Sequence, residues 1–421
     1  MVSETAEPFL WGVATSAFQI EGSPHADWTD WDPFARVQPG MTGHYERFRE
    51  DIALLRSLGV NAYRFSVEWS RIQPREGIWD ESVLAHYRML VEELLASGIE
   101  PVLTLHHNTH PAWFHESTPW YGDRGADRFA AFTRRVVDAM PAVRTWITFN
   151  EPMVMIVGGY LDGCLPPGIR DRNVAVRALA GLLDAHARAY AIIHQRIPGA
   201  RVGIAHNMAA FAPLRPWNPL DRMLSRLGRR GFNLAILEAF RTGRTQLKLP
   251  FARALALEAP VQGTLDFLGV NYYQRLHLRF CMPLRGSHAL EVVHRDGGGC
   301  GLTDMGWEEH PEGLAAVLRE AAAVGVPLML TENGIATTDD ARKISFIRRH
   351  VEALDAARLA GIDIRGYFYW SLTDSYEWLH GMHKRFGLYR VDWRTLERIP
   401  TAASVYFTEL VRKRRAALII T

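Results

Sequence analysis

The sequence has few cysteines for its length. Three occur in 421 residues, at Cys164, Cys281 and Cys300. They form neither an even-numbered disulfide framework nor a Cys-x-x-Cys pair that would indicate zinc. We therefore expect reduced thiols, no metal site and a cytoplasmic location. The first eight residues also lack the basic and apolar regions of a secretory signal, which agrees with that location.

Long apolar runs and an excess of one charge are also missing. No run of about 18 apolar residues is present that could span a membrane. The 48 Lys and Arg residues nearly balance the 46 Asp and Glu residues, for a formal net charge of +2. This balance favours neither nucleic acid nor an anionic membrane as a partner, and a basic cluster at 412–415 is interpreted as a solvated helix end. A small, neutral substrate is expected, and the sequence leaves the choice between monomer and homo-oligomer open.

What the sequence does contain is a regular alternation of short apolar runs and longer amphipathic stretches. The apolar runs predict eight strands, at residues 9–14, 60–66, 100–105, 145–149, 201–205, 265–270, 326–330 and 364–368. The amphipathic stretches predict helices at residues 46–58, 80–97, 124–139, 173–196, 312–324 and 340–360. The helix at 80–97 is expected to bury Leu84, Tyr87, Val91, Leu94 and Leu95.

Eight strands alternating with helices favour a parallel sheet, and that number favours its closed form. An open, doubly wound sheet is the alternative, but it would usually carry a glycine-rich phosphate-binding turn after its first strand. The glycine run at 297–299 follows no clear strand and is interpreted as a loop. We predict an α/β fold, a single (β/α)8 TIM barrel at about 9–410, within one catalytic domain spanning 1–421.

Polar and aromatic side chains follow almost every predicted strand. Functional groups of such barrels gather at the C-terminal strand ends, so these side chains should surround one site. Glu151 and Glu332 follow strands four and seven, and glycoside hydrolysis needs such a pair of carboxyl groups. Amide, imidazole and indole groups suit a neutral sugar. The further candidates are Gln19, Arg64, His107, Asn150, Asn271, Tyr273, Trp370, Glu377 and Trp378.

Five segments carry a resemblance to a known family. They are residues 14–22, 63–72, 148–152, 331–334 and 370–378, and they occur in the family's order. On these motifs the chain resembles glycoside hydrolase family 1, the β-glucosidase and β-galactosidase family. The resemblance covers about residues 9–393. It implies a retaining β-glycosidase that acts on terminal β-D-glucosyl residues, with galactosyl or fucosyl residues as further candidates, and that needs no cofactor.

The resemblance also implies a role for each matching residue. Glu151 would be the acid/base and Glu332 the nucleophile, with Arg64, Asn271 and Tyr273 supporting the nucleophile. Asn150 would face the 2-hydroxyl group, while Gln19 and His107 would face the 3- and 4-hydroxyl groups. Trp370 would be the platform for the sugar ring, and Glu377 and Trp378 would hold its far edge.

The expected protonation states follow from these neighbours. Arg64 and Tyr273 should favour an ionised Glu332, whereas burial and repulsion from Glu332 should raise the pKa of Glu151.

Two alternative functions would use the same residues. A transglycosidase would pass the same glycosyl-enzyme to an alcohol, and a non-catalytic sugar-binding barrel would be expected to lose one of the two glutamates.

Four positions depart from the commonest family pattern, namely Asn108, His110, Ser375 and Tyr376. Asn108 stands where an aromatic residue is usual, so we expect a roomier pocket wall that accepts glucosides, galactosides and fucosides. The alternative is that Trp120 or Trp28 fills the gap. Glu377 should repel a phosphate group, which predicts an unphosphorylated sugar, and Lys384 is interpreted as a loop residue rather than a phosphate ligand.

Overall fold

The computed structural model describes residues 8–32, 41–248, 253–282, 290–297, 299 and 301–417. Cys300 and residues 1–7, which entered the expectations about thiols and signal sequences, lie outside these ranges. The other two cysteines, Cys164 and Cys281, are free. No helix in the described ranges is long and apolar enough to cross a membrane.

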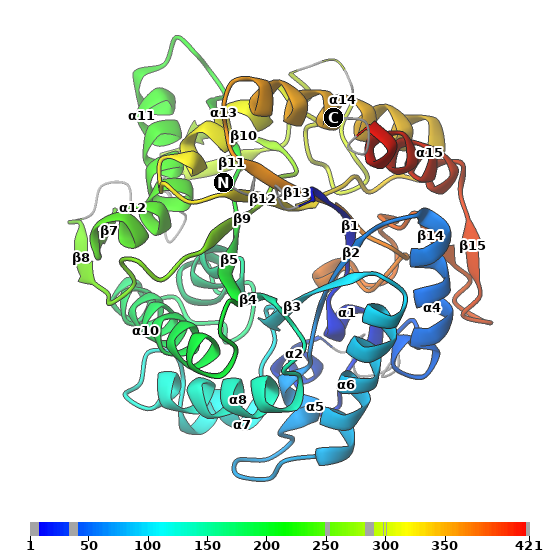
Figure 1. Ribbon diagram of the computed structural model, residues 1–421. Helices are drawn as coiled ribbons and strands as arrows, with labels where there is room; N and C mark the ends of the chain where they lie inside the picture. Colours follow the sequence, from blue (N-terminus) through cyan, green and yellow to red (C-terminus); the bar gives the residue numbers. More distant parts are fainter. Residues whose placement is uncertain are drawn as a thin grey trace, which may run out of the picture.

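Eight parallel strands close into a barrel at the centre of the molecule (Figure 1). Their order around the barrel is β1-β13-β12-β9-β5-β4-β3-β2. The predicted (β/α)8 barrel is therefore confirmed. The strands are β1 (Leu10–Ala14), β2 (Ala62–Ser66), β3 (Glu100–His106), β4 (Thr145–Asn150), β5 (Arg201–Asn207), β9 (Phe267–Asn271), β12 (Leu328–Asn333) and β13 (Ile364–Trp370).

Six of the eight barrel strands extend further at their C-terminal ends than the apolar pattern predicted, whereas β1 and β2 end at the predicted residue. The strand β4 includes Asn150, which pairs with Ala205 of β5, and β12 includes Asn333, which pairs with Tyr369 of β13. The prediction stopped at the last apolar residue, whereas backbone pairing continues through polar residues. Several candidate site residues therefore lie on the strands themselves, which hold them more rigidly than loops would.

An outer ring of helices surrounds the barrel (Figure 1). The six predicted helices are present within two residues of their predicted limits, but Leu95 is 38% exposed, so its predicted burial was wrong. Asp80 is not the first residue of its helix but its cap, accepting hydrogen bonds from the backbone of Ser82 and Val83. The ring contains α4 (His44–Leu58), α6 (Glu81–Ala96), α8 (Gly125–Ala139), α10 (Arg172–Arg196), α13 (Pro311–Ala322), α14 (Asp340–Leu359), α12 (Ala235–Thr242) and α15 (Ala402–Ala417).

The ring helices α12 and α15 were not predicted, and neither were the short elements in the connections. Most of these short elements have too few residues to show a hydrophobic period. Three small sheets have the strand orders β11-β10-β6, β7-β8 and β14-β15. Their strands are β6 (Ala210–Pro213), β7 (Arg244–Leu247), β8 (Leu255–Glu258), β10 (Arg275–Phe280), β11 (Leu290–Val293), β14 (Tyr389–Val391) and β15 (Arg398–Pro400). The short helices are α1 (Ala17–Glu21), α2 (Asp27–Trp31), α5 (Trp69–Ile72), α7 (Ala112–Ser117), α9 (Pro152–Met155), η1 (Ile156–Leu161), α11 (Pro219–Gly228), η2 (Arg229–Leu234) and η3 (Trp378–His380).

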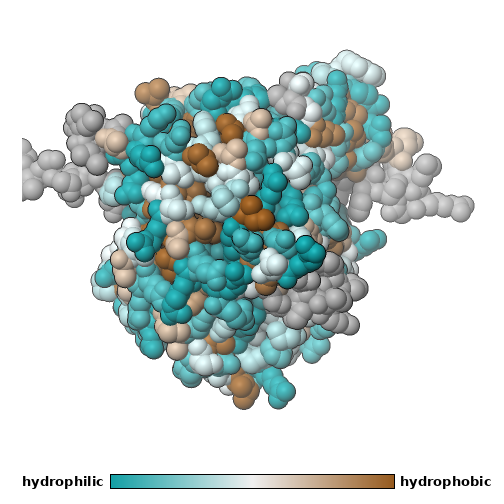
Figure 2. Space-filling view, turned by 90° about the vertical axis from the view of Figure 1, so that its right-hand side faces the viewer, coloured by the Kyte–Doolittle hydropathy of each residue, from teal (hydrophilic) through white to brown (hydrophobic). Residues whose placement is uncertain are grey.

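The core of the described residues has two main layers and a smaller cluster that includes Phe18, Trp28 and Tyr376. One fills the space between the strands and the helix ring, and the other fills the barrel with side chains such as Val102, Phe267 and Phe368. The inner layer includes Tyr273 and Trp370 at the C-terminal end of the barrel, so the candidate site lies directly against the packed core. Figure 2 shows one side of the molecule, where hydrophilic residues dominate and hydrophobic ones are scattered in small groups.

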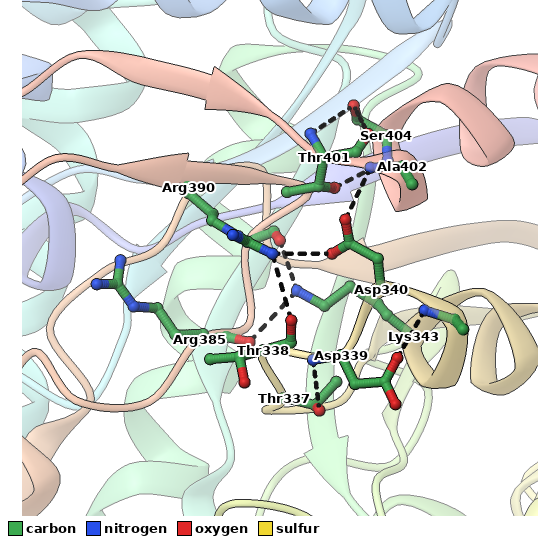
Figure 3. A network of polar contacts seen from close by, with 12 residues as sticks. Thr337, Thr338, Asp339, Asp340, Lys343, Arg385, Arg390, Thr401, Ala402 and Ser404 are labelled. Carbon is green, nitrogen blue, oxygen red and sulfur yellow. Dashed lines mark hydrogen bonds and ion pairs between the residues drawn. The ribbon is translucent and has the colours of Figure 1, made fainter.

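A polar network ties the chain after β13 to the helix ring (Figure 3). Lys343 of α14 is buried, and its Nζ donates to the carbonyl oxygens of Gly387 at 2.7 Å and Arg385 at 3.3 Å. Asp340 accepts hydrogen bonds from Arg390 and from the backbone of Ala402. These contacts fix the segment that follows the barrel's last strand and continues to β14.

Candidate active site

A cavity of about 330 Å³ lies at the C-terminal end of the barrel. Arg64 and Asn271 are fully buried and hydrogen-bond to residues that line it. All eleven predicted site residues therefore meet at one place. Those lining the cavity itself are Gln19, His107, Asn150, Glu151, Tyr273, Glu332, Trp370, Glu377 and Trp378.

Glu332 is held by a partner at each carboxyl oxygen. Arg64 Nη1 lies 2.6 Å from Oε1, and the hydroxyl of Tyr273 donates to Oε2 at 2.6 Å. Burial raises the pKa of Glu332, while the Arg64 guanidinium and the Tyr273 hydroxyl act in the opposite direction. Both partners stabilise the charged form of Glu332 against the effect of its burial.

Glu151 has a different environment. Its carboxyl Oε1 accepts hydrogen bonds from Asn271 Nδ2 at 2.9 Å and Asn207 Nδ2 at 2.8 Å. Burial and the nearby charge of Glu332 raise the pKa of Glu151 to about 7. Near neutral pH this group can therefore exist both as an acid and as a base, which is the property that general acid/base catalysis requires.

The backbone of Glu151 is strained. Its φ of 48° and ψ of 53° lie in the left-handed region, which costs energy for a residue with a Cβ. Its amide donates to the carbonyl of Ala205 at 2.7 Å, and Pro152 begins the helix α9 immediately after it. The neighbouring strand and helix thus hold the carboxyl group in an orientation that the free chain would rarely adopt.

Asn150, Arg64 and Asn271 connect the two carboxyl groups. Asn150 Oδ1 accepts from Arg64 Nη2 at 2.6 Å and from Asn271 Nδ2 at 3.0 Å. Asn271 was predicted beside the nucleophile, and a hydrogen bond with it does lower the pKa of Glu332. Its additional contact with Glu151 means that one amide serves both carboxyl groups.

Gln19 and Glu377, two of the residues predicted to hold the sugar, contact each other in the same cavity. Gln19 Nε2 donates to the carbonyl oxygen of Tyr376 at 2.7 Å and to Glu377 Oε2 at 3.3 Å. Burial and the charges of Glu332 and Glu151 raise the pKa of Glu377 to about 8. The raised pKa favours the uncharged form of Glu377 and so weakens the repulsion of a phosphate group that was expected from this residue.

The position of Trp370 depends on the close approach of the C-terminal ends of β12 and β13. A Cβ added at Gly334, two residues after Glu332, would lie 1.9 Å from the carbonyl oxygen of Trp370. Only glycine permits this approach. The Trp370 ring stacks with that of His107 at a centroid distance of 5.7 Å and an angle of 22°, so the two rings face the cavity together.

An aromatic residue, Trp28, lies beside Asn108 in the cavity wall. Trp28 Nε1 donates to the carbonyl oxygen of Asn108 at 3.2 Å, and its ring lies 4.7 Å from that of Trp378. Trp28, Asn108 and His110 all line the cavity. Trp120, the other candidate, is only 1% exposed and belongs to the core.

Sequence reasoning missed Asn207, the last residue of β5. The apolar run predicts a strand that ends at 205, two residues before Asn207, and none of the five family motifs includes this position. In the described ranges, no group of three or more His, Cys, Asp or Glu side chains could hold a metal ion.

Comparisons with known proteins agree with this geometry. The family model described as "Glycosyl hydrolase family 1" matches residues 2–416. The chain is 34% identical to a β-glucosidase A of Thermotoga maritima, over 98% of both chains. It is 30% identical to a β-galactosidase of Pyrococcus woesei, over 96% of both. Among solved structures, a β-glycosidase from Pyrococcus horikoshii superposes with a TM-score of 0.88 at 37% identity, covering 96% of this chain and 94% of that one.

Proposed function

Since the chain belongs to glycosyl hydrolase family 1 and is a retaining β-glycosidase, we propose that Glu332 is its nucleophile and Glu151 its acid/base. The observation that carries this assignment is the difference between their partners. Glu332 has a guanidinium group at 2.6 Å, whereas the partners of Glu151 are two neutral amides and its pKa is raised to about 7. The charged carboxyl attacks and the neutral one donates a proton.

The reaction proceeds in two steps, formation of the glycosyl-enzyme and its hydrolysis. In the first, a Glu332 oxygen forms a bond to the anomeric carbon, the bond to the aglycone oxygen breaks, and Glu151 gives its proton to that oxygen. In the second, Glu332 no longer carries a charge, so the pKa of Glu151 falls. Glu151 then removes a proton from water, the water oxygen bonds to the anomeric carbon, and Glu332 is released as a carboxylate.

The glycone is proposed to be a neutral, unphosphorylated hexose. Gln19, His107, Asn150 and Glu377 offer hydrogen bonds to hydroxyl groups, and the Trp370 ring offers an apolar face. The described residues that line the cavity include no Lys or Arg to hold a phosphate. Lys384 instead donates from its Nζ to the carbonyl oxygen of Asp304. A higher kcat/KM for a 6-phosphoglucoside than for the matching glucoside would contradict this proposal.

Replacement of the nucleophile tests the assignment. Glu332→Ala should lose activity on an aryl β-glucoside by at least about 10⁴-fold, because no glycosyl-enzyme can form. Added azide should restore turnover and yield the α-glycosyl azide, detected by NMR. Glu309→Ala, which removes another buried glutamate outside the cavity, should keep activity without azide. Near-normal hydrolysis by Glu332→Ala without azide would refute the assignment.

A cytoplasmic location is also proposed. It rests on Cys164 and Cys281, which are free thiols and do not form a disulfide with each other.

A further inference from the structure

Lys343 belongs to the outer helix α14, but its side chain points inward and is bound to the segment that carries Phe386. The residue is 2% exposed. Its Nζ donates to the carbonyl oxygens of Gly387 at 2.7 Å and Arg385 at 3.3 Å (Figure 3). Burial lowers the pKa of Lys343 to about 8, whereas the charge of Asp374 favours its ammonium form. One amino group thus binds the two backbone carbonyl groups on either side of Phe386.

The residue between these two carbonyl groups, Phe386, is part of the cavity wall. Residues 383–387 belong to no helix or strand, so their backbone depends on contacts with other segments. The carbonyl oxygen of Phe386 accepts from the hydroxyl of Tyr369 at 3.2 Å, and that of Arg385 accepts also from the amide of Thr337 at 3.1 Å. Three consecutive carbonyl groups are therefore held by β13, by α14 and by the chain between β12 and α14.

The Phe386 ring connects this segment with Glu332, the proposed nucleophile. It packs edge-on against the ring of Tyr273, at a centroid distance of 6.2 Å and an angle of 77°. Both rings are buried in the inner core layer. The Tyr273 hydroxyl in turn donates to Glu332 Oε2 at 2.6 Å. Because closely packed interiors transmit small shifts, a displaced Phe386 would change the position of Tyr273 and its bond to Glu332.

Glu377, by contrast, is held by contacts that do not involve Lys343. The amide of Tyr376 donates to the carbonyl oxygen of Gln19 at 3.1 Å, and Gln19 Nε2 donates to the carbonyl oxygen of Tyr376 at 2.7 Å. The amide of Glu377 donates to the carbonyl oxygen of Gly381 at 2.7 Å. A change at Lys343 should therefore disturb the nucleophile more than the binding of the sugar.

We propose that Lys343 is a positioning residue for the nucleophile Glu332, acting through the segment 385–387. The inference rests on the role proposed above for Glu332 and adds a residue of the outer helix ring, which none of the five family segments includes. Arginine can donate to both carbonyl groups, whereas methionine has a similar length and no donor. Lys343→Arg should therefore keep the function that Lys343→Met loses.

Labelling of the nucleophile by dinitrophenyl 2-deoxy-2-fluoro-β-glucoside tests the proposal. A Glu332 oxygen bonds to the anomeric carbon and dinitrophenolate departs without a proton from Glu151, so the rate of inactivation reports on the nucleophile. In Lys343→Met the inactivation rate constant should fall at least about tenfold, while the Kd of the inactivator stays within about threefold of the wild-type value. Lys343→Arg should stay within about threefold of the wild type in both quantities.

Two further variants separate positioning from a general loss of stability. Arg349→Met removes the ion pairs of α14 with Glu309 at 3.0 Å and Glu312 at 3.1 Å, and it should leave the rate constant unchanged. Tyr369→Phe removes the hydroxyl that holds the carbonyl group of Phe386, and it should lower the rate constant by about threefold. Thermal unfolding of each variant shows that it is folded at the assay temperature.

An unchanged inactivation rate constant in Lys343→Met would overturn the proposal, and so would an equal fall in Arg349→Met. If Lys343→Met does not fold, a wild-type rate constant in Tyr369→Phe would overturn it. Mass spectrometry of the labelled wild-type enzyme keeps the two proposals apart. A label on a residue other than Glu332 would refute the proposed function, whatever the rates of the variants.

Discussion

Asn207 donates a hydrogen bond from its side-chain amide to the carboxyl Oε1 of Glu151 at 2.8 Å. Asn207 is the last residue of β5, and Glu151 directly follows β4. Because these two strands are paired, their pairing fixes the separation of the two residues. This bond stabilises the charged carboxyl and opposes the effect of burial on the pKa of Glu151. Asn207 is therefore a positioning residue that lowers the proton affinity of Glu151, the proposed acid/base.

Removal of this amide should shift the pH profile. In Asn207→Ala, the pKa of Glu151 should rise, and the alkaline limb of kcat/KM should move up by about 0.5–1 pH unit. Asn218→Ala is the control, because Asn218 caps α11 outside the cavity and its loss should affect stability alone. An alkaline limb in the same position in Asn207→Ala and wild type would argue against the role.

Glu151→Gln should discriminate between leaving groups. Substrates with poor leaving groups need protonation and should slow by about 10²–10⁴-fold, whereas activated aryl glucosides should slow much less in the glycosylation step. Wild-type kcat/KM should fall as the pH rises through about 7, because Glu151 then loses the proton that it must donate. This alkaline limb should vanish in the variant, as measured in pre-steady-state kinetics. Equal losses on both substrate types would exclude Glu151 as the acid.

Glu377→Gln should stabilise the empty enzyme at high pH. The pKa of Glu377 is raised from 4.5 to about 8, so between these values the folded protein keeps a proton that the unfolded chain releases. The free energy of unfolding of the wild type therefore falls as the pH rises through this range. At pH 8 the variant should be more stable by roughly 2–4 kcal/mol, with little difference near pH 4.

Calorimetry at the two pH values measures this difference. Glu92→Gln is the control, because the side chain of Glu92 is 64% exposed on α6. A stabilisation of Glu377→Gln that is the same at both pH values would mean that another cause, such as altered packing, is responsible.

Trp28 should control the choice of sugar. Trp28 lies against Asn108 in the cavity wall, so Trp28→Ala should widen the pocket. The kcat/KM values for glucosides, galactosides and fucosides should then differ from one another by about tenfold less than in the wild type. Asn108→Trp should change the wild-type differences little, because Trp28 already lies beside this position. If Trp28→Ala left all the ratios unchanged while Asn108→Trp narrowed them, the open wall expected from the sequence would be the better description.

The barrel was predictable because its signal is repeated eight times. Each strand is a short apolar run buried on both faces, and each main helix has an apolar stripe. One wrongly assigned element would therefore not change the predicted fold. The short sheets were missed for the opposite reason, since β6, β10 and β11 are four to six residues long and mostly half-buried. Their residues Leu276 and Arg275 show no period that could be recognised in isolation.

The sequence by itself determined the fold class and the residues gathered at the strand ends, because a closed barrel brings all those ends to one place. It could not determine which of them touch. The tertiary structure decided that Asn271 bonds to both Asn150 and Glu151. It also decided that Trp28 lies beside Asn108 and that the pKa of Glu377 is raised. The physical reason is that hydrogen bonds, side-chain packing and burial depend on distances of a few ångströms between distant segments of the chain, which local patterns do not encode.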